Sequence, residues 1–183
     1  MTAAQDEIER IRFLVRVAAR ERRYLVDTDQ RLFAEPFTPE RAGTLDRHPE
    51  EAERVDAFVA RLARLQDTLG DKLVPALLSA LGERTGPALD NLDRAERFGW
   101  IPSSDEWFAI RKLRNQMIHE YIEDPKVLAS ALQRGHDYVP TLAEVTDRLK
   151  AVAVERQWVD QDGERIDFDY VQESCIASGH TKE

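Results

Sequence analysis

Cysteine, glycine, proline and long apolar runs are all scarce in this chain of 183 residues. The single cysteine, Cys175, excludes an internal disulfide framework and a cysteine-rich zinc site. No run of about 18 apolar residues occurs, so the sequence predicts no membrane span. The first residues, Met1 to Glu7, contain neither the basic nor the apolar part of a signal peptide. We therefore expect a soluble, cytoplasmic protein with no membrane association.

The charge balance is acidic, with a formal net charge of -9. Segment 155–183 holds eight acidic and three basic residues, so more than half of the net negative charge lies in this last part. A globally acidic chain argues against a protein that coats nucleic acid without specificity. A local cationic site remains compatible with this composition.

Long amphipathic runs dominate the rest of the chain. Apolar residues recur at steps of three, four and seven, which is typical of helices with one buried face. Gly70 and Pro75 interrupt one run, and Gly135 and Pro140 are expected to bend or split the last one. The runs cover residues 8–33, 55–81, 88–98, 107–121 and 127–154. The prediction is an all-α, up-and-down bundle of four long helices plus shorter ones, formed by residues 1–154.

Several helix ends can be read directly. Thr38-Pro39 is a start signal, with Thr at the N-cap and Pro in the first turn. Ser103 and Glu106 form a capping box at the start of the fourth helix. Pro125 disfavours helical geometry at the residue before it, so the fourth helix should end near residue 123.

The acidic tail, residues 155–183, has a different character. Apolar and polar residues partly alternate around Asp162-Gly163, a two-residue turn signal that predicts a β-hairpin. The alternative is a disordered acidic tail.

One polar cluster late in the fourth helix suits phosphate chemistry. Asn115 and His119 are four residues apart and share a face, while Arg114 and Tyr121, two turns apart, lie on an adjoining strip. An arginine supplies a permanent bidentate phosphate clamp. The negative end of the helix dipole should make His119 more basic than usual.

The spacing alone leaves other interpretations of this polar cluster open. A polar cluster on an amphipathic helix is commonly a solvated edge, and a helical tyrosine such as Tyr121 commonly packs its ring on the bundle. Of the other histidines, His48 is expected in a loop, and His136 is expected to be solvated. None of them has a second ligand at metal spacing, so we expect no metal and no cofactor.

The order Arg114-Asn115-x-x-x-His119-x-Tyr121 in an all-helical chain resembles the RNxxxHxY signature of the HEPN superfamily. The HepT toxins, which are encoded beside minimal nucleotidyltransferases, look most similar. The resemblance covers roughly residues 5–150 and leaves the tail without a counterpart.

The resemblance implies an endoribonuclease toxin that cleaves RNA without a metal. Arg114 would bind the scissile phosphate, His119 would transfer the proton as the 2′-hydroxyl attacks, and Asn115 would orient His119 or the phosphate. The partner nucleotidyltransferase, acting as antitoxin, would adenylylate Tyr121 and silence the toxin. Two protomers would pair so that both motifs line one cleft.

We also expect the fourth helix to take part in the homodimer interface. Its apolar residues cover more than one face, so we expect them to serve both the core and the interface between protomers: Trp107, Phe108, Ile110, Leu113, Met117 and Ile118. We expect Arg114 and His119 to lie at a groove, where truncation costs little stability. The competing functions are a non-catalytic nucleotide- or substrate-binding subunit of a nucleotidyltransferase, and a plain helical dimerisation module.

Overall fold

The computed structural model describes residues 3–119 and 124–160, and every regular element among them is helical. The long helices are α1 (Ala3–Leu32), α3 (Pro49–Asp67), α6 (Ser104–His119) and α7 (Pro125–Glu155). A π-helical turn, η2 (Thr68–Leu73), joins α3 to α4 (Val74–Ala80). Shorter elements are α2 (Pro39–Ala42), the 3-10 turn η1 (Leu45–Arg47) and α5 (Ala88–Arg97). The predicted all-α bundle is confirmed.

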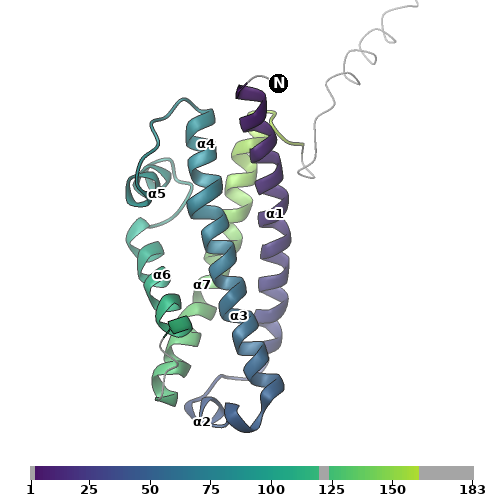
Figure 1. Cartoon of the computed structure of the whole chain (residues 1–183), viewed down its shortest axis with the longest axis vertical. Coiled ribbons are helices and arrows are strands. Elements are labelled where there is room, and N and C mark those ends of the chain that lie inside the picture. The colour runs from purple at the N-terminus through teal and green to yellow at the C-terminus, as the bar shows by residue number, and fades with distance from the viewer. Residues whose placement is uncertain (1–2, 120–123, 161–183) are drawn as a thin grey trace, which may run out of the picture.

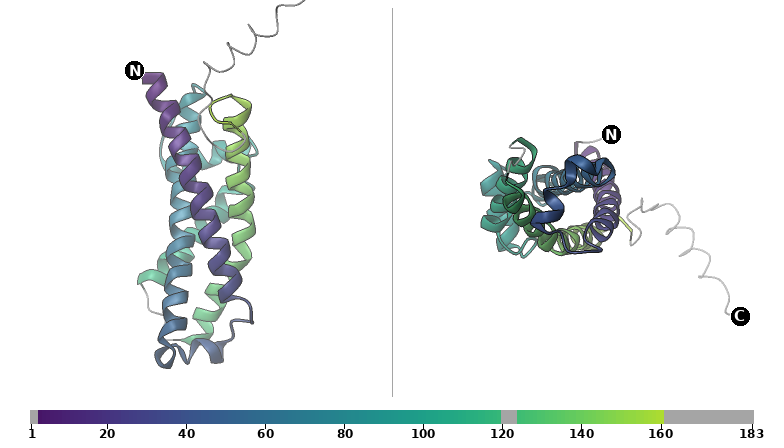
Figure 2. Two further views of the ribbon diagram at one scale, coloured as in Figure 1. Left: turned by 90° about the vertical axis from the view of Figure 1, so that its right-hand side faces the viewer. Right: turned by 90° about the horizontal axis from the view of Figure 1, so that it is seen from below.

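The long helices lie side by side and alternate in direction (Figure 1). The chain descends along α1, returns through α3 and α4, descends again along α6 and rises along α7. Figure 2 shows α1, α3 and α7 packed around one axis, with α2 crossing the end of the bundle at which α7 begins. α5 lies beside α4 and leads into α6. The predicted up-and-down order is therefore correct.

The apolar faces predicted from the sequence meet in one core. Burial of these side chains is the main source of stability in a bundle, since each fully buried Leu, Ile or Phe contributes about 1.5–3 kcal/mol. The fully buried members come from all the long helices and include Ile11, Leu25, Phe58, Leu62, Leu77, Trp107 and Leu142.

The helix starts follow the predicted capping chemistry. The Thr38 hydroxyl accepts a hydrogen bond from the Arg41 amide at 3.2 Å, and the Ser103 hydroxyl accepts one from the Glu106 amide at 3.1 Å. At the start of α7 the Asp124 carboxylate accepts from the Lys126 amide at 2.8 Å. These side chains satisfy amide groups that the first turn of a helix leaves unpaired.

Gly135 and Pro140 were expected to bend or split the last helix, and the split is wrong, because α7 runs without a break from Pro125 to Glu155. Gly135 lies where α7 approaches α3, and a Cβ there would come within 3.3 Å of the Phe58 and Leu62 side chains. The packing of α7 on α3 holds the helix together through residues of low helix propensity.

The π-helical turn η2 has a specific packing role. Gly70 lies in this turn, directly against the Trp107 ring of α6, and a Cβ at Gly70 would be 2.9 Å from the indole nitrogen. The Trp107 ring is completely buried and meets Tyr138 of α7 edge-on at 6.4 Å between ring centroids. Gly70 therefore provides the space in which α6 docks.

Within residues 3–119 and 124–160, no helix combines the length and apolar character that crossing a membrane requires. The segment expected to form a hairpin or an acidic tail lies outside these residues from position 161 onward.

We predict that Gly70→Ala destabilises the protein, although alanine favours a helix. The added methyl group meets a rigid, buried ring, and overpacking of this kind costs about 1–3 kcal/mol. The melting temperature should fall by about 2–4 °C for each kcal/mol. Thermal unfolding followed by circular dichroism measures the change.

Gly43→Ala is the matched control, since a Cβ at Gly43 makes only ordinary contacts of 3.5 Å or more and the backbone there is already helical. It should melt within about 2 °C of the natural protein. A Gly70→Ala protein that melts at the same temperature as Gly43→Ala would show that the ring and the turn do not constrain each other.

Candidate functional site

The N-terminal half of α6 is firmly anchored. The Ser104 amide donates to Glu96 at 2.7 Å, and the Ser104 hydroxyl donates to Asp93 at 2.7 Å, so α5 holds the start of α6. One turn later, the Gln66 side-chain amide of α3 donates to the Trp107 carbonyl at 2.8 Å. These contacts fix the register in which the rest of α6, with the predicted motif, faces α3.

Arg114 points inward from α6 against α3. Its Nη1 donates to the Ala63 carbonyl at 2.7 Å, and its Nη2 donates to Asp67 Oδ1 at 2.8 Å. Only 8% of the Arg114 side chain is exposed, against 40% of Asp67. The expectation that Arg114 lies at an open groove, where truncation costs little, is therefore corrected: it forms a largely buried ion pair between two helices.

Arg111, one turn earlier on α6, joins the same cluster. Its Nη2 donates to Asp67 at 3.1 Å and also to Asp71, which lies about one turn later in the chain, in η2. Burial alone would lower the pKa of the Arg111 guanidinium, but the hydrogen bonds and negative charges of Asp71 and Asp67 raise the pKa above its usual value. Two arginines thus share one carboxylate, and the cluster carries balanced charge.

The cluster leaves several buried polar atoms without hydrogen-bond partners among the described residues. They are Nε of Arg111, Nε of Arg114, the Trp107 indole nitrogen and Gln66 Oε1, all between α6 and the α3–η2 segment. An arginine has five N–H donors. Arg114 uses one hydrogen bond from each Nη, so it keeps unused donor capacity in the same place.

Sequence reasoning missed Arg111, Asp67 and Asp71. Their spacing carried a signal: the aspartates are four residues apart, and Arg111 and Arg114 are three apart, so each pair occupies one helix face. Only the docking of α6 on α3 shows that the two faces meet.

The remaining motif residues separate from Arg114. Asn115 is exposed on the outward side of α6, where no described residue bonds to it. His119 is the last residue of α6, and its side chain lies outside the described part of the structure, as does Tyr121. The structure therefore places Arg114 and Asn115 on different sides of α6 and describes no contact between Arg114 and His119.

Five of the six apolar residues expected to serve core and interface pack within the protomer. Trp107, Ile110 and Met117 are buried in the core, and Phe108 and Leu113 pack partly against it, while the Ile118 side chain lies outside the described part of the structure. Asp105, Ala109, Lys112 and Asn115 of the same helix are exposed. The core thus accounts for these five residues, and the homodimer stays a prediction.

His136 was expected to be solvated, but its ring contacts Asp29 and Phe33. Its Nδ1 lies 2.7 Å from the Asp29 carboxylate, and its ring stacks on Phe33 at 4.1 Å between centroids. Burial raises the pKa of Asp29, while the contact with His136 opposes that rise. This pair joins α1 to α7. Elsewhere among the described residues, no three His, Cys, Asp or Glu side chains gather as a metal-binding group.

Comparison with known proteins adds no relative: no family model, no curated protein and no solved structure significantly matches this chain. The fold and the site define an all-α bundle in which a cluster of two arginines and two aspartates holds α6 on α3 and η2.

We predict that Arg114→Ala lowers the free energy of unfolding by about 1–3 kcal/mol. The substitution leaves a space between α6 and α3 and removes a donor from the Ala63 carbonyl. Asp67 keeps Arg111 as a partner and is partly exposed, so the loss should stay below that of a fully buried ion pair. Urea unfolding at equilibrium gives the difference.

Lys112→Ala is the control, because Lys112 lies on the same helix but is exposed. Its effect should be within about 0.5 kcal/mol. If both variants unfold at the same urea concentration, the Arg114–Asp67 pair contributes nothing to the fold, and Arg114 is free for another role.

Proposed function

We propose that this protein is a HEPN-type endoribonuclease toxin that cleaves RNA without a metal and is silenced by a partner nucleotidyltransferase. The observation that carries the proposal is the RNxxxHxY motif, whose Arg114-to-His119 part forms the end of α6, in a bundle of the all-α, up-and-down type that the resemblance implies. α6 is anchored at its start and held by α3 at Arg114, which gives the motif a fixed support.

In the proposed reaction, the 2′-hydroxyl of one nucleotide attacks the adjacent phosphorus, and the 5′-oxygen of the next nucleotide leaves. His119 accepts the hydroxyl proton. A second acid, which the motif of a paired protomer would supply, donates a proton to the leaving oxygen. Arg114 would stabilise the negative charge on the phosphate oxygens. The products are a 2′,3′-cyclic phosphate and a free 5′-hydroxyl.

A single His119 supplies one acid–base group, so we propose that a homodimer brings two motifs to one cleft. Asn115 lies on the outward face of α6 and would orient His119 or the phosphate there. Arg114 has unused N–H groups, but its burial means that Asp67 or the end of α6 has to move before a phosphate reaches them.

That same burial favours a second candidate function. If Arg114 serves only to hold α6 on α3, the protein would be a non-catalytic nucleotide- or substrate-binding subunit of the nucleotidyltransferase. In that case its exposed surfaces bind the partner or the nucleotide, and the purified chain cleaves no RNA.

We predict that His119→Ala reduces RNA cleavage by about 10²–10⁴-fold, because a general acid–base group is lost. The purified protein is incubated with labelled RNA and EDTA, and the product ends are tested for cyclic phosphate. His48→Ala, which removes an exposed histidine between η1 and α3, should cleave at the natural rate.

Equal cleavage by His119→Ala and the natural protein would indicate a contaminating nuclease and contradict the proposal. No cleavage by the natural protein, together with nucleotide-dependent binding to the nucleotidyltransferase, would establish the second candidate instead.

We predict that the neighbouring nucleotidyltransferase, given ATP, adds one or more AMP groups to Tyr121. Tyr121 follows Arg114 by seven residues, about two turns of a helix. The phosphodiester charge of AMP would compete for the guanidinium that the RNA phosphate needs. Intact-mass spectrometry should show the added mass and its loss in Tyr121→Phe.

Tyr24→Phe is the control, because Tyr24 is an exposed tyrosine outside the motif. It should be modified like the natural protein. Modification that persists in Tyr121→Phe would exclude Tyr121 as the acceptor.

A further inference from the structure

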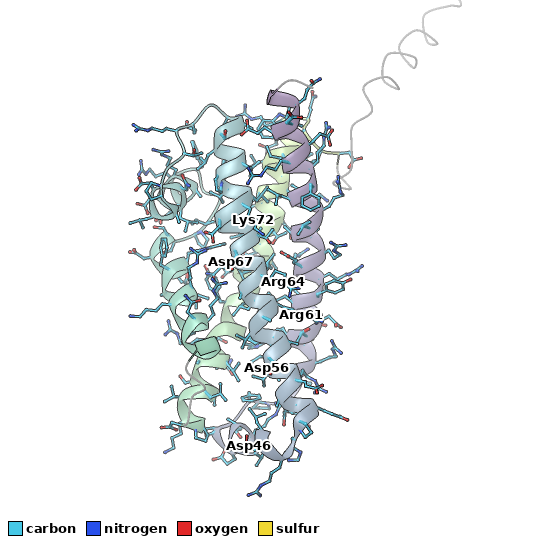
Figure 3. The ribbon with its side chains drawn as sticks, viewed as in Figure 1. Asp46, Asp56, Arg61, Arg64, Asp67 and Lys72 are labelled. Atoms are coloured by element: carbon cyan, nitrogen blue, oxygen red, sulfur yellow. The ribbon has the colours of Figure 1, made fainter. Side chains whose placement is uncertain are left out.

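Although the chain is acidic, one face of the bundle gathers cations from two helices. α1 contributes Arg20 and Arg23, and the α3–η2 segment contributes Arg61, Arg64 and Lys72; we call these five residues the basic strip. Figure 3 shows Arg61, Arg64 and Lys72 following one another along this segment, beside α1. From residue 61 to residue 72 the strip extends about 16 Å along the helix.

Three cations of the strip influence the same acidic side chain, Glu21. Burial raises the pKa of Glu21, and a hydrogen bond with Thr68 and the charges of Arg64, Lys72 and Arg20 oppose that rise. Glu21 is therefore an acid near three cations of the strip.

At the other end of the strip, Tyr24 holds two guanidinium groups together. Arg23 lies over the Tyr24 ring at 5.2 Å and Arg61 at 5.7 Å, both measured to the ring centroid. Arg61 also donates to the Tyr24 carbonyl at 3.1 Å and to the Thr28 hydroxyl. Cation–π contacts of this kind orient a guanidinium without neutralising it.

No carboxylate among the described residues forms a salt bridge with a member of the strip. Three acids on the neighbouring faces are engaged elsewhere: Asp67 and Asp71 bind the arginines of α6, and Asp27 binds Arg31 at 2.8 Å. Glu21 is the acid that lies among the cations, so the five cations of the strip still leave an excess of positive charge in a protein whose net charge is -9.

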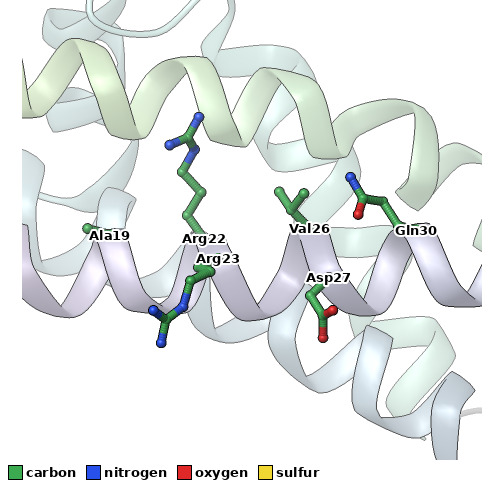
Figure 4. A pocket seen from close by; sticks show the side chains of 6 residues that line it. All are labelled: Ala19, Arg22, Arg23, Val26, Asp27 and Gln30. Carbon is green, nitrogen blue, oxygen red and sulfur yellow. The ribbon is translucent and has the colours of Figure 1, made fainter.

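A hollow of about 520 Å³ lies beside α1 (Figure 4). Arg22 lines it but reaches Asp147 of α7 at 3.0 Å, and Asp27, another lining residue, is paired with Arg31. Arg23, a member of the strip, also lines the hollow and forms no salt bridge among the described residues, so the hollow borders the strip and only its Arg22 and Asp27 charges are paired within the protein.

We propose that the basic strip binds the phosphate backbone of the RNA substrate and leads it to α6. The assignment deepens the proposed ribonuclease function and depends on it. Arg64 is about one helical turn from Asp67, the carboxylate that holds Arg114, so the middle of the strip lies on the same stretch of α3 that holds the motif-bearing helix on its other side. A row of cations without salt-bridge partners is the arrangement that a polyanion recognises, through charge and counterion release rather than base sequence.

The test measures binding of a fluorescent single-stranded RNA by anisotropy, in the His119→Ala background so that RNA is not consumed. The triple variant Arg20→Gln/Arg64→Gln/Lys72→Gln should bind at least about tenfold more weakly. For this variant, the slope of log K against log salt concentration should be shallower by about 2, since each phosphate contact to a single strand contributes about 0.7.

The matched control is Arg84→Gln/Arg97→Gln/Arg134→Gln, three exposed cations outside the strip that form no salt bridge among the described residues. It changes the net charge equally and should keep the natural affinity and salt dependence. Lys72→Gln alone should make the slope shallower by about 0.7, which serves if the triple variant folds poorly.

Equal weakening in the two triple variants would overturn the proposal, because net charge alone would then explain binding. Polyglutamate that competes as well as RNA at equal charge would also overturn it and point to an acidic protein partner. Loss of cleavage in His119→Ala with no effect of the strip variants on binding would reject the strip and keep the ribonuclease. Strip-dependent binding without any cleavage by the natural protein would reject the ribonuclease and keep the strip.

Discussion

The close packing of the Trp107 ring on the backbone of Gly70 is the constraint on which the rest of this fold depends. The indole is completely buried, and any side chain at residue 70 would enter the space it fills. Because Gly70 lies in a π-helical turn, the rod formed by α3 and α4 changes its pitch at the point where α6 crosses it. The register of α6 follows from this contact, and so does the place where its arginines meet α3.

Charge is arranged in two different ways on either side of that rod. Toward α6, Asp67 and Asp71 neutralise Arg111 and Arg114, and the buried guanidinium groups help to hold two helices together. Toward α1, Arg64 and Lys72 are exposed, and no residue of the described part of the chain forms a salt bridge with them. Two sides of the same α3–η2 segment thus carry a structural use of arginine and the surface that we propose for a polyanion. Under the proposed function, a phosphate reaching Arg114 has to compete with Asp67, which links RNA binding to the packing of α6.

Helices and their ends could be predicted because their causes are local. Ser103 and Thr38 cap the helices that their sequence positions indicate, and the apolar spacing gave the buried faces of α1, α3 and α7. Gly135 and Pro140 show the limit of such reasoning: both disfavour a helix, yet α7 continues, because Gly135 allows close packing on Phe58. Local propensity amounts to about 1 kcal/mol for such a glycine, whereas burial along a helix of this length contributes more.

The sequence by itself determined the all-helical class, the order of the long helices and the position of the Arg114–His119 motif late in α6, because periodicity and capping depend only on neighbours along the chain. It could not decide that Arg114 faces Asp67 while Asn115 faces outward, or that His136 pairs with Asp29 across two helices. Those contacts join residues far apart in the chain, such as Arg114 and Ala63. They exist only once the helices have docked, since the rotation of each helix about its axis is set by how its side chains fit its neighbours.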